Sequence, residues 1–181
     1  VVSNRDKNLM FKRNRELRVN SIIHPIFESD LLEKKEIERI LRLRNCNKSS
    51  IRFIMYGNFN SNFEYLEKNI LFLINLFQNK KLDGIKLEIQ FFGSSAKLIN
   101  SNIYKFDKYS SFLSLITSER FNSFTELVAI NSFCFFPFEG GSGTKTRVLS
   151  ALANGIPVLT NNEGIFGIKD YWKNDLMLIN F

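Results

Sequence analysis

A glycine-rich segment followed by two cations is the part of the chain whose residue types could bind an anion. It leads into Lys145 and Arg147 and follows an apolar stretch that ends at Phe138. Glycines let a backbone approach a ligand closely, and the N–H groups that open a helix have no acceptor inside it. The helix dipole favours negative charge at the same end, by roughly 0.3–2 kcal/mol depending on burial. A phosphate-binding loop is therefore predicted at Gly140, Gly141, Ser142, Gly143 and Thr144.

The residues after this loop predict a helix over 144–154 with two different faces. The apolar and small residues share one stripe that should pack on a sheet: Thr144, Val148, Ala151, Leu152 and Gly155. The second stripe is polar and borders the loop: Gly143, Arg147, Ser150 and Asn154. We expect Arg147 to contact the bound anion, because its planar donors fork onto phosphate oxygens. A solvent-facing Arg147 is the alternative. Gly155 and Pro157 should end the helix and open the next strand.

Short apolar runs alternate with helical patterns along the part of the chain that must position the loop. Strands are predicted at 51–56, 86–92, 103–106, 132–138, 156–160 and 176–179, and helices at 62–79, 110–117, 124–130 and 144–154. This alternation is typical of an α/β fold, with a Rossmann-like parallel sheet covered by helices on both faces.

Three of the predicted strands end in glycine: Gly57, Gly93 and the Gly140 loop. If these strands are parallel neighbours, the three loops meet at the edge where open α/β folds bind ligands. For Gly57 or Gly93 taken singly, a tight turn is the simpler interpretation.

The first fifty residues have a different organisation. A strand at 1–3, a helix over 4–14, a β-rich stretch at 19–23 and a helix over 28–44 are predicted, followed by a polar stretch at 45–50. His24 precedes Pro25, which favours extended backbone, and we assign this histidine no catalytic role. A domain boundary is expected between residues 27 and 50.

Charge and composition narrow the classes of function. The net charge of +7 suggests anionic ligands, and much of the excess lies before residue 50. We interpret those cations as solvated helix faces rather than a nucleic-acid site, since no stacking motif or zinc spacing accompanies them. The 19 phenylalanines are interpreted mainly as buried strand residues. Cys46 and Cys134 indicate neither a metal site nor a disulfide framework, which favours a reducing compartment. No apolar run in the sequence is long enough to span a membrane.

The run from Phe136 to Thr160 resembles the donor-binding motif of retaining, group 1 nucleotide-sugar glycosyltransferases of GT-B architecture. The next residues, 161–168 with Glu163-Gly-Ile-Phe-Gly, resemble the loop that follows in that family. The resemblance extends over residues 51–181, because the strands that end at Gly57 and Gly93 fall where the family's C-terminal domain has its first two strands. Residues 1–27 are similar to the tail of the N-terminal acceptor domain, and 28–50 correspond to a linker helix and linker.

The resemblance implies a glycosyltransferase fragment that binds a nucleotide-diphosphate sugar for retaining transfer to an unknown acceptor. Arg147 and Lys145 are the implied catalytic cations, because they stabilise the leaving nucleotide diphosphate. The implied donor-binding residues are Gly57, Asn58, Gly140, Gly141, Ser142, Gly143, Thr144 and Ser150. No metal and no cofactor are implied. A glycan or lipid-linked acceptor would bind the missing part of the N-terminal domain, and the closing helices after Phe181 are also expected to be missing.

This chain departs from the family at the ribose end of the site. The family usually has a glutamate at the position of Ser150, which binds the ribose, and a second one at Ser142. Losing a charge-assisted hydrogen bond removes about 1.5–3 kcal/mol, roughly ten- to more than a hundredfold in affinity. Many members of the family carry an arginine and a lysine after the first strand. Their positions fall near Asn58 and Phe63 in this chain, and neither residue is cationic.

These departures keep two other readings open. One is a non-catalytic relative that uses the fold as a binding or assembly module with a degenerate donor site. The other is an unrelated Rossmann-like nucleotide enzyme such as a dehydrogenase, which is disfavoured because no Gly-x-Gly-x-x-Gly follows the first strand. We expect the isolated chain to be inactive and its location to be cytoplasmic, and a peripheral contact with the inner membrane face stays open.

Overall fold

The computed structural model describes residues 33, 35, 38, 39, 49–57, 62–80, 82, 84–120, 132–139, 145–166, 168 and 176–178. The chain divides into two compact units. We call Glu33–Phe135 the central unit, and Val1–Leu32 together with Phe136–Phe181 the C-terminal unit.

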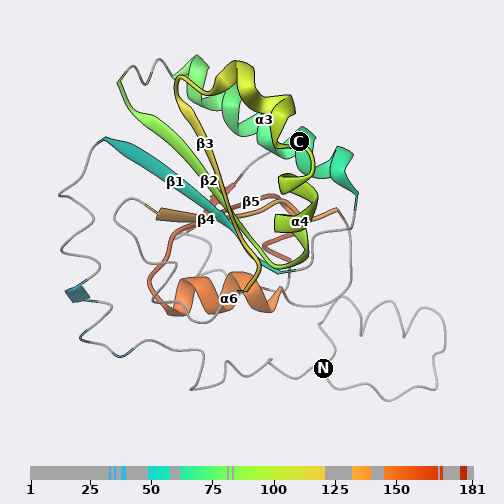
Figure 1. Cartoon of the computed structure of the whole chain (residues 1–181). Coiled ribbons are helices and arrows are strands. Elements are labelled where there is room, and N and C mark those ends of the chain that lie inside the picture. Colours follow the sequence, from blue (N-terminus) through green and yellow to red (C-terminus); the bar gives the residue numbers. More distant parts are fainter. Residues whose placement is uncertain are drawn as a thin grey trace. The chain divides into compact units, whose positions relative to one another are not determined.

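The central unit is built on parallel strands. These are β1 (Ser50–Met55), β2 (Lys86–Phe92), β3 (Leu113–Ser118) and β4 (Ser132–Phe136), in the order β3-β2-β1-β4. Figure 1 shows β1, β2 and β3 side by side. Along the chain, β2 and β3 are added on one side of β1, and β4 is then added on the other side of β1. The direction in which strands are added therefore reverses at β1, and a topological switch point lies between β1 and β4. The predicted parallel α/β fold is confirmed.

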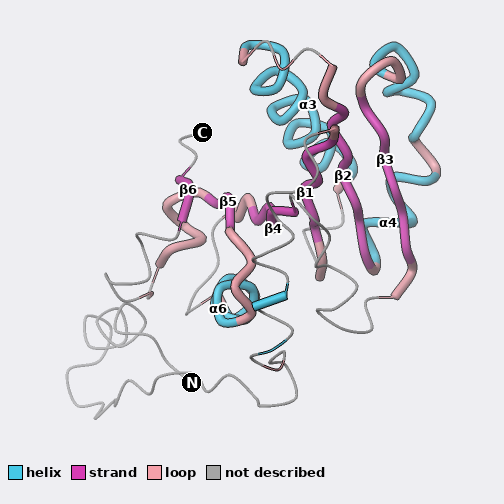
Figure 2. Tube along the Cα trace, turned by 90° about the vertical axis from the view of Figure 1, so that its left-hand side faces the viewer, coloured by secondary structure: helices cyan, strands magenta, loops and turns pink. Residues whose placement is uncertain are grey.

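Two helices cover one face of these strands. α3 (Phe63–Asn79) packs on β2, α4 (Ser94–Asn100) packs on β2 and β3, and the two helices contact each other. Figure 2 shows both helices on the same side of the strands. The apolar face that the sequence predicts for α3 is buried: Leu66, Ile70, Leu73, Ile74 and Phe77.

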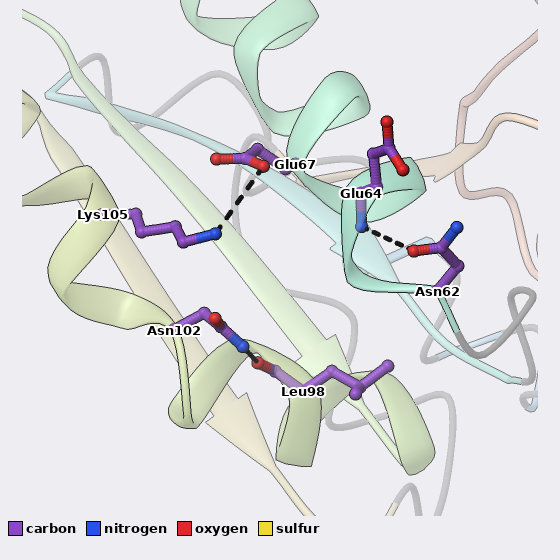
Figure 3. Close-up of polar contacts among 6 residues, drawn as sticks. All are labelled: Asn62, Glu64, Glu67, Leu98, Asn102 and Lys105. Carbon is purple, nitrogen blue, oxygen red and sulfur yellow. Dashed lines mark hydrogen bonds and ion pairs between the residues drawn. The ribbon is translucent and has the colours of Figure 1, made fainter.

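Side-chain contacts fix the ends of these helices (Figure 3). The Asn62 Oδ1 atom accepts a hydrogen bond of 2.9 Å from the Glu64 N–H, so Asn62 caps α3. The Asn102 Nδ2 atom donates to the Leu98 carbonyl at 2.9 Å, just after α4. An ion pair of 4.0 Å joins the Lys105 Nζ atom to Glu67 on α3.

Phenylalanines fill the core, as the sequence predicts. Phe91 and Phe92 on β2 and Phe135 and Phe136 on β4 are almost completely removed from solvent. Burying such a side chain contributes about 1.5–3 kcal/mol relative to leaving it exposed. On α3, the Phe72 ring stacks on Phe135 with their centroids 6.5 Å apart. Cys134 on β4 is buried.

The second segment of the C-terminal unit starts at Phe136, the last residue of β4. It contains α6 (Thr146–Ala153), β5 (Val158–Thr160) and β6 (Leu176–Leu178), and β5 is parallel to β6. Gly155 has a φ of 68° and stops the helix, as predicted. Its N–H donates to Leu152 and that of Ile156 to Ala151, which is the Schellman arrangement.

Two predicted elements in the central unit are wrong. The strand predicted at 103–106 is part of a 3₁₀-helix, η2 (Ile103–Tyr109), and the helix predicted at 110–117 is mostly β3. At the start of β3, apolar Leu113 and Leu115 alternate with polar Ser114, as in a strand. The backbone of β3 pairs with β2 over the whole length of the strand. Pairing with an existing strand outweighs local helix propensity here. In addition, α4 was not predicted.

Other expectations fall largely outside the described residues. They are the elements before residue 33, the helix at 124–130, the linker at 45–50, Cys46 and His24. Lys35, Glu38 and Arg39 are helical, in agreement with the helix predicted over 28–44. Within the described ranges, no helix has the length and apolar character needed to cross a membrane. The same ranges contain no cluster of three or more His, Cys, Asp or Glu side chains that could hold a metal ion.

Candidate functional site

The ends of β1 and β2 bring Gly57, a predicted donor-binding residue, and Gly93, the predicted end of the second strand, to one edge of the central unit. Met55 and Phe91 are partners in the parallel register, and Gly57 and Gly93 follow them at the same edge. Their φ angles of 91° and 76° lie in the region that glycine adopts without strain. An added Cβ at Gly93 would meet nothing within 4 Å, so its backbone conformation, and not lack of space, calls for glycine there. Asn58 lies outside the described residues.

In the C-terminal unit, the structure describes both sides of the predicted phosphate loop but not the loop itself. Gly140, Gly141, Ser142, Gly143 and Thr144 lie outside the described residues. Phe138 and Lys145 flank this segment, and the Lys145 Nζ atom lies 5.1 Å from the centre of the Phe138 ring. This cation–π contact joins the residues before and after the glycine run.

The start of α6 is positively charged. Lys145 is the N-cap residue, no side chain of the cap bonds to the first turn, and no acidic residue stands in that turn. Arg147 adds a second cation in the first turn. Cations at a helix N-terminus are normally unfavourable, because that end already carries the positive pole of the helix dipole. Lys145 is only 9% exposed, so little solvent screens its charge. This turn is therefore the candidate anion site of the described residues.

The two faces of α6 largely follow the prediction. Val148 and Ala151 are fully buried, as expected for the face that packs on the sheet. On the other face, Arg147 and Ser150 are half-buried, and the Nη1 atom of Arg147 is buried. Asn154 differs from the expected polar surface residue. It is fully buried, and its Nδ2 atom donates to the Ser150 carbonyl at 2.7 Å, so its amide helps to close the helix.

Sequence reasoning missed a cluster of hydrogen bonds that holds the segment before the glycine run. Asn161 follows β5, and its side-chain amide bonds both backbone groups of Phe138. Beside it, the Thr160 hydroxyl donates to the Phe136 carbonyl. The signal in the sequence was Asn161 directly after an apolar strand, in the stretch that resembles a family loop. A polar residue after a strand can face solvent, cap a turn or bond another segment. The sequence alone does not show that the partner of Asn161 is Phe138.

Parallel strands in the order β3-β2-β1-β4, a switch point beside β1, and a helix with a cationic N-terminus define a Rossmann-like α/β fold with a candidate anion site. No protein-family model matches the sequence, and no curated protein matches it.

Among solved structures, the chain is similar to WaaG, a glycosyltransferase involved in lipopolysaccharide biosynthesis. The two share 13% sequence identity with a TM-score of 0.61, and the match covers 99% of this chain and 48% of WaaG. The chain thus spans about half the length of that protein. At this identity, the similarity establishes the Rossmann-like α/β fold and not the activity.

Proposed function

We propose that the chain is the donor-binding part of a retaining glycosyltransferase of GT-B architecture and that it binds a nucleotide-diphosphate sugar. The observation that carries the proposal is the start of α6, where Lys145 and Arg147 stand at the positive pole of the helix without an acidic residue in the first turn. A diphosphate would neutralise this charge. The motif that resembles the donor-binding run of group 1 enzymes and the structural similarity to WaaG favour a nucleotide sugar over other anions.

The proposed chemistry follows from these cations. In glycosyl transfer, the bond between the anomeric carbon and the diphosphate breaks, and an oxygen of the acceptor bonds to that carbon and gives up its proton. The nucleoside diphosphate leaves with extra negative charge, which Lys145 and Arg147 would stabilise. Their positions on a helix and its cap keep them in place before the reaction, which lowers the cost of reorganisation. The proposed site needs no metal or cofactor, because these cations take the role of the positive charge.

The remaining donor contacts belong to the same proposal. Gly57 and Asn58 would approach the donor from the β1 end, the residues 140–144 would bind the phosphates, and Ser150 would make a polar contact near the ribose. The acceptor, a glycan or a lipid-linked glycan, would bind an N-terminal domain. We propose a cytoplasmic location, with peripheral contact at the inner membrane face, and no nucleic-acid partner.

One observation favours a second candidate function. Ser150 is a half-buried residue of α6, at the position where the family that this sequence resembles usually has a glutamate. A serine hydroxyl cannot supply a charge-assisted bond to the ribose, so the nucleoside would bind less tightly. A non-catalytic binding or assembly module with a degenerate donor site is therefore the alternative. Restoring the carboxylate separates the two: Ser150→Glu should tighten nucleoside diphosphate binding if the ribose end of the site is still formed.

Calorimetry with uridine, guanosine and adenosine diphosphates tests donor binding directly. Arg147→Ala and Lys145→Ala should each weaken the best ligand at least tenfold, as expected for one charge-assisted contact worth about 1.5–3 kcal/mol. The matched control is Lys86→Ala, which removes the same charge from the exposed, opposite end of β2 and should change affinity less than twofold. Absence of binding to all of the nucleotides, or equal affinities for Arg147→Ala and Lys86→Ala, would refute the proposal.

A further inference from the structure

The side chain of Asn161 makes hydrogen bonds to two separate parts of the C-terminal unit. Its Oδ1 atom accepts from the Phe138 N–H at 3.3 Å, and its Nδ2 atom donates to the Phe138 carbonyl at 2.7 Å. The same Oδ1 atom accepts from the Gly164 N–H at 3.2 Å. One amide group thus holds the segment after β4 and the turn after β5.

This geometry needs an amide. The carboxamide carries a donor and an acceptor in one plane, so it can satisfy both backbone groups of a single residue as a neighbouring strand would. β4 ends at Phe136 and β5 at Thr160, where the Thr160 hydroxyl donates to the Phe136 carbonyl. Asn161 therefore continues the connection between the two chain segments beyond the last strand residues. All three of its bonds are partly buried, which limits competition from water.

Phe138 also makes a cation–π contact with Lys145. The Lys145 Nζ atom lies 5.1 Å from the Phe138 ring centre, and Lys145 is the N-cap of α6. The ring can fix the ammonium group only if the Phe138 backbone is itself fixed. Asn161 supplies that constraint through its two bonds to this residue. A chain of contacts therefore runs from Asn161 through Phe138 to the cation at the helix N-terminus.

We infer that Asn161 is a positioning residue for the donor diphosphate: it holds the Phe138 backbone, and through the Phe138 ring it sets the position of the Lys145 ammonium group. The inference rests on the proposed function for its ligand, but the contact between Asn161 and Phe138 does not. Asn161 itself touches neither the phosphate nor the sugar in this scheme. Its effect on binding arises from the order that it imposes on the cation.

Amide hydrogen exchange and calorimetry with uridine diphosphate test the two parts separately in the whole chain. Asn161→Leu keeps the size of the side chain and removes every bond, and Asn161→Ala does so without adding apolar bulk, should the leucine variant fail to fold. The control is Asn102→Ala, which removes one side-chain bond to the Leu98 carbonyl in the central unit. We expect the Asn161 variants to raise the exchange rate of the Phe138 N–H at least tenfold and to lower the affinity for uridine diphosphate at least tenfold. The control should change each of these two values less than twofold.

Each contrary result overturns a different statement. Unchanged exchange at Phe138 in the Asn161 variants overturns the backbone contact, whether or not the nucleotide binds. Faster exchange together with an affinity equal to that of Asn102→Ala overturns the positioning role. Failure of the unmodified chain to bind any nucleoside diphosphate, with exchange at Phe138 as expected, overturns the proposed function and leaves the contact between Asn161 and Phe138 established.

Discussion

Replacing Gly164 with alanine should destabilise the C-terminal unit because the added methyl group has no room. A Cβ built at Gly164 lies directly against the Thr160 hydroxyl, 2.9 Å from the Thr160 Cβ and 3.0 Å from its Cγ2. Thr160 is fully buried, and its hydroxyl donates to the Phe136 carbonyl. The side chain therefore cannot move aside without giving up that bond.

Two terms set the size of the effect. Overpacking of a buried site costs about 1–3 kcal/mol. Leaving the Phe136 carbonyl without its hydroxyl donor costs about 1–3 kcal/mol more. We therefore expect Gly164→Ala to lower the free energy of unfolding by about 2–6 kcal/mol, a large part of the roughly 5–15 kcal/mol of a typical domain.

Urea unfolding followed by circular dichroism measures this change, and a double-mutant cycle identifies its cause. Thr160→Ala removes the hydroxyl and Cγ2 and leaves only the Cβ contact, so Gly164→Ala should cost less than half as much in that background. Gly84→Ala is the control, because its Cβ would meet nothing within 4 Å and only its φ of 78° is unfavourable. Its cost, about 1–2 kcal/mol, should not depend on Thr160. A Gly164→Ala cost below about 0.5 kcal/mol, or one that Thr160→Ala leaves unchanged, would refute the reasoning.

Two further predictions concern the central unit. Asn62→Ala removes the acceptor of the 2.9 Å bond from the Glu64 N–H and should lower stability by about 0.5–2 kcal/mol, while Asn62→Asp should retain most of it; equal unfolding midpoints for the two variants would contradict the cap. Glu88→Gln removes the charge that forms the 2.8 Å ion pair with Arg52. The Arg52 side chain is 27% exposed and the Glu88 side chain is 19% exposed. The coupling in a double-mutant cycle with Arg52→Met should be about 1 kcal/mol and should shrink in salt, and a coupling indistinguishable from zero would contradict it.

Where residue spacing was regular, the sequence predicted the fold well. The strand at 86–92 has the predicted bounds, and α3 begins one residue after the predicted start because Asn62 is its cap. Here hydrophobic periodicity and capping chemistry act within a few residues of each other. The segment from Ile103 to Ser118 lacked such a pattern, and both of its elements were wrong. β3 exists because β2 offers it a partner, which is a property of the sheet and not of the local sequence.

The candidate site was predictable to a different extent. The sequence indicated Lys145 and Arg147 as the cations at a helix start, and the structure places both there. It did not indicate that Asn154 is buried or that Asn161 bonds Phe138, since these roles depend on residues that are distant in the chain or on the helix end.

The sequence by itself therefore determined the α/β class, the burial of the strand phenylalanines Phe91, Phe92, Phe135 and Phe136, and the cationic start of α6, because composition and periodicity act locally. Only the tertiary structure decided the strand order, which places β4 beside β1, and the hydrogen bonds between Asn161, which follows β5, and Phe138, two residues after β4. Those features need two segments more than 20 residues apart, such as Phe138 and Asn161 with a separation of 23, to approach within hydrogen-bonding distance. No local preference specifies such a meeting, because it depends on how the sheet buries its apolar faces.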